Sequence, residues 1–125
     1  MSKVAVVMGS ISDWAVAEKA VDTLRAYQVE PVVRVLSAHR TPEETRGFTR
    51  TLEQEDVSVV IALAGMAAHL AGAIAAGTVL PVIGVPVASG TLSGQDALFS
   101  TVQMPSGIPV ATVAIGGARN AALLA

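Results

Sequence analysis

Short apolar runs alternate along the chain with longer segments in which apolar residues recur at helical spacing. Five runs rich in Val, Ile and Leu predict buried strands at 4–8, 31–36, 57–63, 81–87 and 109–115. The intervening segments are typical of amphipathic helices, at 14–25, from 42 onward, at 67–76, at 93–103 and from 118 onward. Strands that alternate with helices favour a parallel sheet covered on both faces. We therefore expect an α/β fold, a flavodoxin-like and Rossmann-like three-layer sandwich with a five-stranded parallel sheet.

One predicted helix carries a recognisable start signal. Thr41 is a capping residue type, Pro42 suits the first helical position, and Glu44 lies where the side chain of a capping box would return to the backbone. We therefore predict a capping box between Thr41 and Glu44.

Charged residues are concentrated in the first half of the chain. The chain has 8 Lys and Arg and 10 Asp and Glu in 125 residues, and only Asp96 and Arg119 follow position 56. The uncharged stretch 57–88 is long enough to raise the question of a membrane span. Gly65, Gly77 and Pro81 interrupt it, which is typical of strand, turn and helix instead. We expect no membrane insertion, and a homo-oligomer that buries much of the second half.

Composition excludes several functional classes. A net charge of −2 provides no basic footprint for nucleic acid. The chain has no cysteine and 2 histidines, which excludes a zinc site of the Cys type and argues against a metal site built mainly from imidazoles, so no metal is expected. The apolar run after Lys3 is too short for the core of a signal peptide, so a cytoplasmic location is expected.

Polar residues follow the first predicted strand, where ligands of such folds bind. The segment holds Gly9, Ser10, Ser12 and Asp13. Hydroxyls and free N–H groups at a helix start suit a phosphate, and a carboxylate suits ribose hydroxyls. The alternative is an ordinary capping turn.

The next two strand ends add proton-transfer and anion-binding groups. Ser37, Ala38, His39 and Arg40 follow the second strand, and the third precedes a segment that contains Gly65, Ala67, His69 and Leu70. Arg40 can clamp an anion, and a histidine can move a proton near neutral pH. A solvated loop and a structural histidine are the alternatives. Together these residues favour a cofactor-free enzyme acting on a small phosphorylated ribose compound, with a non-catalytic nucleotide-binding module as the second hypothesis.

Longer strings of the chain resemble the PurE family. They include Val-Val-Met-Gly-Ser-Ile-Ser-Asp-Trp at 6–14, Ser-Ala-His-Arg-Thr-Pro at 37–42, Ala-Ala-His-Leu at 67–70 and Val-Gln-Met-Pro-Ser-Gly-Ile-Pro-Val at 102–110. The resemblance implies an N5-carboxyaminoimidazole ribonucleotide mutase of the bacterial type in purine biosynthesis, with no cofactor. It implies that the substrate releases carbon dioxide in a closed pocket and that C4 of the aminoimidazole recaptures it.

The same resemblance assigns residue roles. His39 would handle the proton of C4, and His69 would assist it. Substrate binding would fall to Gly9, Ser10, Ser12, Asp13, Ser37, Ala38, Arg40, Gly65, Ala67 and Leu70, with the serines on the phosphate and Asp13 on the ribose. Arg40 favours the mutase over a direct aminoimidazole ribonucleotide carboxylase, whose branch tends towards Lys there. A related ribonucleotide carboxylase and a non-catalytic nucleotide-binding paralogue are the remaining alternatives.

Two departures from the family pattern stand out. Met66 and Ala71 replace a glycine and a proline of the loop that covers the base. The family usually continues for a few dozen residues as a helix that reaches a neighbouring subunit, and its members are commonly octamers. We therefore expect 1–125 to form a single PurE-like domain that lacks most of that helix.

Overall fold

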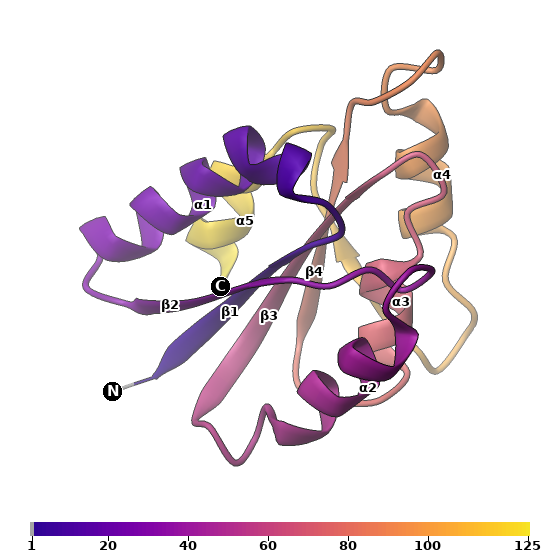
Figure 1. The fold of residues 1–125 in the computed structure, drawn as a ribbon. Coiled ribbons are helices and arrows are strands. Elements are labelled where there is room, and N and C mark those ends of the chain that lie inside the picture. The colour runs from indigo at the N-terminus through magenta and orange to yellow at the C-terminus, as the bar shows by residue number, and fades with distance from the viewer. Residues whose placement is uncertain (1) are drawn as a thin grey trace.

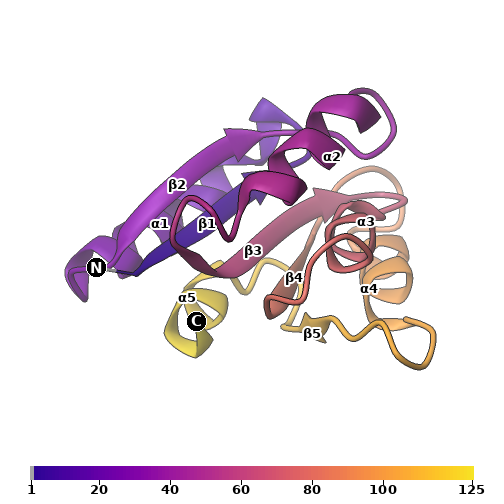
Figure 2. The same ribbon diagram turned by 90° about the horizontal axis from the view of Figure 1, so that it is seen from below.

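The computed structural model describes residues 2–125 and contains one five-stranded parallel sheet (Figure 1). The strands are β1 (Lys3–Met8), β2 (Glu30–Val35), β3 (Val57–Gly65), β4 (Val82–Val87) and β5 (Ala111–Thr112). The helices are a 3₁₀ turn η1 (Ile11–Asp13), α1 (Trp14–Ala26), α2 (Pro42–Thr51), α3 (Leu70–Ala75), α4 (Gln95–Val102) and α5 (Ala118–Leu124). The strand order β2-β1-β3-β4-β5 is the flavodoxin-like order, and Figure 2 shows the strands following one another in this sequence.

Helices cover both faces of the sheet, so the predicted three-layer sandwich is confirmed. Helices α1 and α5 lie together on one face, and α2, α3 and α4 cover the other (Figure 1). The alternation of side chains along a strand produces two cores. In β1, Val4, Val6 and Met8 pack in the cluster that includes α1 and α5, whereas Ala5 and Val7 pack in the cluster that includes α3.

Several predicted elements are shorter than the sequence suggested, and the fifth strand and the helix predicted at 67–76 differ most. The fifth strand is limited to Ala111–Thr112, although Val113 N–H still donates to Gly84 O at 3.2 Å. It begins after Pro109, which has no N–H to donate to a ladder. Helix α3 begins at Leu70 instead of residue 67, and residues 66–69 form an irregular loop in which Met66 has a left-handed φ of 55° and the Ala68 N–H donates to the Ser100 hydroxyl at 2.9 Å.

The predicted capping box at Thr41 is wrong. Thr41 is the N-cap of α2 and Pro42 opens the helix, but the Thr41 side chain makes no capping bond. Its Oγ1 instead accepts the N–H of Ser37 at 2.9 Å. A capping box occurs elsewhere, between Ser10 and Asp13 around η1.

Helix α4 packs directly on β4 at Gly84. A Cβ added there would collide with Cγ2 of Thr101 and lie 3.1 Å from Cγ1 of Val110. The missing side chain therefore lets α4 approach the sheet and fixes its distance from the neighbouring β3–α3 loop. Within residues 2–125, no helix is long and apolar enough to cross a membrane.

Candidate active site

A pocket of about 360 Å³ lies at the carboxyl ends of β1, β2, β3 and β4. It is lined by residues of the four loops that follow these strands, so the strand order itself brings distant segments together. Its walls are Gly9, Ser10, Ser12, Asp13, Ser37, Ala38, His39, Arg40, Ala64, Gly65, Met66, Ala67, His69, Leu70 and Ser89.

The first loop holds a carboxylate at the start of α1. Asp13 is only 7% exposed, and its Oδ2 accepts the N–H of Ser10 at 3.2 Å. Burial raises the pKa of Asp13 above its ordinary value of 3.8, and the Ser10 hydrogen bond opposes this effect. The Ser10 and Ser12 hydroxyls lie 2.9 Å apart. The segment is thus a capping turn whose polar side chains also line the pocket.

Threonine side chains lock the second loop. The carbonyl of Ser37 accepts bonds from the hydroxyls of Thr41 and Thr45, both at 3.2 Å, and the Ser37 hydroxyl accepts the N–H of Arg40 at 3.0 Å. Thr45 is buried within α2, so these bonds tie the loop to the helix. The loop therefore holds His39 and Arg40 in a defined position.

His39 and His69 contact each other at one end of the pocket. Nε2 of His39 lies 2.8 Å from Nδ1 of His69, and the rings are nearly perpendicular at 88°. Such a contact requires that one nitrogen carries the proton and the other accepts it. The contact therefore restricts the ring orientation of each partner, and both imidazoles line the pocket.

The third loop, residues 65–69, closes one side of the pocket. Met66 lies in the left-handed region at φ 55°, and its side chain is 57% exposed. A residue other than glycine is strained in the left-handed region. This agrees with the family pattern, which has a glycine at this position. The Met66 side chain reaches Gly90 of the β4–α4 loop, where an added Cβ would lie 3.7 Å from Cγ of Met66.

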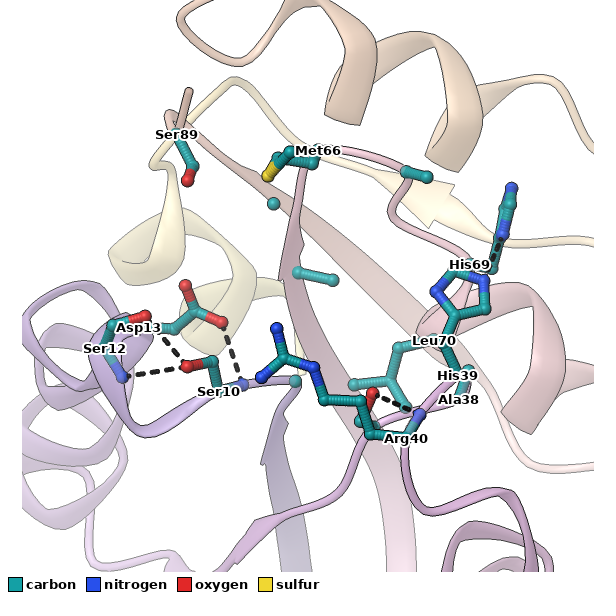
Figure 3. A pocket seen from close by; sticks show the side chains of 15 residues that line it. Ser10, Ser12, Asp13, Ala38, His39, Arg40, Met66, His69, Leu70 and Ser89 are labelled. Carbon is teal, nitrogen blue, oxygen red and sulfur yellow. Dashed lines mark hydrogen bonds between the residues drawn. The ribbon is translucent and has the colours of Figure 1, made fainter. Parts of the chain in front are cut away.

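The pocket has two chemically different ends. Figure 3 shows Ser10, Ser12 and Asp13 at one end and the two imidazoles at the other, with Arg40 extending between them. The first end offers hydroxyls and a carboxylate, and the second offers a proton-transfer group. A ligand with a sugar phosphate at one end and a reactive ring at the other matches this arrangement.

The structure brings all twelve predicted site residues to this pocket, and the roles assigned to them stay predictions. Sequence reasoning did not include Ala64, Met66 and Ser89 in the site. Ser89 follows β4, so the rule that ligands bind beyond strand ends could have found it. Within residues 2–125, no group of three or more His, Cys, Asp or Glu side chains is placed to hold a metal ion.

Comparisons with known proteins identify related chains. A family model described as AIR carboxylase matches residues 3–125. The N5-carboxyaminoimidazole ribonucleotide mutase of Saccharolobus solfataricus is 55% identical over 125 residues, which cover 100% of this chain and 79% of the relative. The Escherichia coli K12 protein of the same name is also 55% identical, and the match covers 99% of this chain and 75% of that protein.

A solved structure agrees with this relationship. The crystal structure of Treponema denticola PurE superposes with a TM-score of 0.89 at 33% sequence identity, over 99% of this chain and 77% of that chain. The expected family resemblance is therefore confirmed by sequence and by fold, and the chain belongs to the AIR carboxylase (PurE) family.

Proposed function

We propose that this chain is an N5-carboxyaminoimidazole ribonucleotide mutase of purine biosynthesis, which forms 4-carboxy-5-aminoimidazole ribonucleotide. The observation that carries the proposal is the 55% identity to proteins of this name over essentially the whole chain. The two-ended pocket supports it, because the substrate joins a ribose phosphate to an aminoimidazole.

Substrate binding would use the end of the pocket that is rich in hydroxyls. Ser10, Ser12 and Ser37 would donate to the phosphate, and Arg40 would neutralise its charge. Asp13 would accept the ribose hydroxyls. Its burial supports this role, because a desolvated carboxylate costs stability and is typical of functional positions.

The reaction would proceed through carbon dioxide held in the pocket. The N5–carboxylate bond breaks, N5 gains a proton and carbon dioxide is released next to C4. C4 then attacks the carbon dioxide, a new C–C bond forms, and the proton on C4 leaves to restore the aromatic ring. His39 would give the proton to N5 and take one from C4, so the acid is regenerated in each cycle. His69 would orient the His39 ring through their 2.8 Å contact.

Carbon dioxide must not escape between the two steps. Recapture from solution would be a dilute bimolecular step, whereas a trapped molecule reacts as part of one complex. His39 and Met66 are exposed in the isolated chain. We therefore propose that the working form is a homo-oligomer, the octamer that the family resemblance implies, and exposed apolar side chains such as Phe99 and Val102 on α4 support this. A single domain at 1–125 and a cytoplasmic location stay predictions.

Direct carboxylation of aminoimidazole ribonucleotide is the second candidate, because the description of the family model names that activity.

To test the mutase, the purified chain is incubated with N5-carboxyaminoimidazole ribonucleotide without bicarbonate, and formation of the C4-carboxylated isomer is followed against the spontaneous background. Conversion above background is expected. No conversion by folded protein would reject the mutase. A parallel incubation with aminoimidazole ribonucleotide and bicarbonate would then separate the carboxylase from a non-catalytic paralogue.

A further inference from the structure

We infer that Ser100 on α4 is a positioning residue that holds the 65–69 loop, and through it the His69–His39 pair, in register for the reaction. The effect of Ser100 on catalysis rests on the proposed function. Its role in holding the loop rests on the hydrogen bonds alone.

The Ser100 hydroxyl bridges two elements that are distant in sequence. Its oxygen accepts the N–H of Ala68 at 2.9 Å, and its proton is donated within α4 to the carbonyl of Asp96 at 2.8 Å. One hydroxyl thus connects the helix backbone to the loop. The side chain does not line the pocket, so it acts on the site through the loop: through Ala68, and through a longer 3.4 Å contact from the hydroxyl to the Met66 carbonyl.

The Ala68 N–H needs this partner. Ala68 is 2% exposed, so water does not reach it freely, and it lies two positions before Leu70, the first residue of α3. A buried donor that loses its acceptor is costly because nothing replaces the bond. The loop around it is irregular: Met66 is left-handed and His69 N–H donates to the Ala67 carbonyl at 3.0 Å. The Ser100 bond is therefore a fixed point in a segment without helix or strand bonding.

Small displacements of this loop reach the reacting groups. Ala68 lies between Ala67, which lines the pocket, and His69, whose Nδ1 lies 2.8 Å from His39. A shift of about 1 Å breaks a hydrogen bond of this length, and misplacements of that size in an active site reduce rates strongly. The phosphate-binding end of the pocket is built by other loops and is not affected directly.

Substitutions at Ser100 separate the hydroxyl from its packing. Ser100→Thr keeps the hydroxyl. Ser100→Val introduces a side chain of nearly the same shape as threonine but without the hydroxyl. We expect kcat of Ser100→Val to fall about tenfold or more with KM changed less than about threefold, and Ser100→Thr to retain kcat within about threefold of the wild type. Ser58→Ala, an exposed serine on β3, is the control and is expected to match the wild type.

Amide hydrogen exchange measured by NMR tests the structural part without substrate. The Ala68 amide is expected to exchange about tenfold faster in Ser100→Val than in the wild type or Ser100→Thr. Equal exchange in all three proteins, or equal kcat in Ser100→Thr and Ser100→Val, would overturn the inference. If the wild-type chain does not convert the substrate, the proposed function fails, and the exchange rate at Ala68 still decides whether Ser100 holds the loop.

Discussion

Replacing Gly84 with alanine tests how closely α4 must approach the sheet. Gly84 is buried in the centre of β4, and an added Cβ would meet Thr101, Val110 and the Cβ of Ala71, the last at 3.4 Å. Inserting a methyl group into a packed core costs about 1–3 kcal/mol. Alanine also lowers the conformational entropy of the unfolded chain relative to glycine, which stabilises the folded state by about 0.4–1 kcal/mol. Gly84→Ala is therefore expected to lower the free energy of unfolding by about 1–2 kcal/mol.

A second glycine provides a matched control. Gly47 lies within α2, and an added Cβ there would have nothing within 4 Å. Alanine is the better helix former by about 1 kcal/mol, so Gly47→Ala is expected to raise the free energy of unfolding by up to that amount. Both variants thus change glycine to alanine, but the structure predicts changes of opposite sign in the free energy of unfolding.

Urea unfolding followed by circular dichroism, at one fixed protein concentration, measures the two variants against the wild type. The fixed concentration matters because association contributes to apparent stability. The two variants are thus expected to differ by about 1–3 kcal/mol, and at roughly 3–5 °C per kcal/mol for a chain of this size their melting temperatures in a thermal scan should differ by about 3–15 °C. A Gly84→Ala protein as stable as the wild type, alongside a stabilised Gly47→Ala protein, would refute the described packing of α4 on β4.

Three further substitutions address the pocket. His39→Asn should lower turnover by about 10²–10⁴-fold and leave the urea midpoint nearly unchanged, because the side chain is exposed; near-normal turnover would reject His39 as the proton carrier. Asp13→Asn should weaken substrate binding. The raised pKa of Asp13 means that the folded state holds this proton more tightly than the unfolded state, so the ionised group lowers stability as pH rises above about 3.8. The stability of Asp13→Asn relative to the wild type should therefore increase as the pH rises above about 3.8, and urea unfolding that shows no pH trend would contradict this. Met66→Val should destabilise the fold by about 1 kcal/mol or more relative to Met66→Gly, because φ 55° is poor for a β-branched residue; equal melting temperatures would argue against the left-handed loop.

Local pattern was sufficient for much of this protein. The apolar runs and the helical spacing between them predicted the five parallel strands and the layered fold, because a strand buried on both faces leaves a continuous apolar run. The rule that ligands bind beyond strand ends then selected loops that do line one pocket. Extended strings such as 37–42 also indicated the family, which the comparisons confirmed.

Contacts between distant segments were decided by the tertiary structure. His39 and His69 are 30 positions apart and meet at 2.8 Å only because β2 and β3 both flank β1 and end at the same edge of the sheet. Even over a short range, the Thr41 hydroxyl accepts the N–H of Ser37, four positions earlier, instead of capping α2, because the folded loop brings this N–H to the hydroxyl. The bond from Ala68 to Ser100 depends on the approach of α4 at Gly84. Sequence periodicity records which faces are buried, whereas the partner of a particular hydroxyl or imidazole depends on packing distances that no local pattern contains.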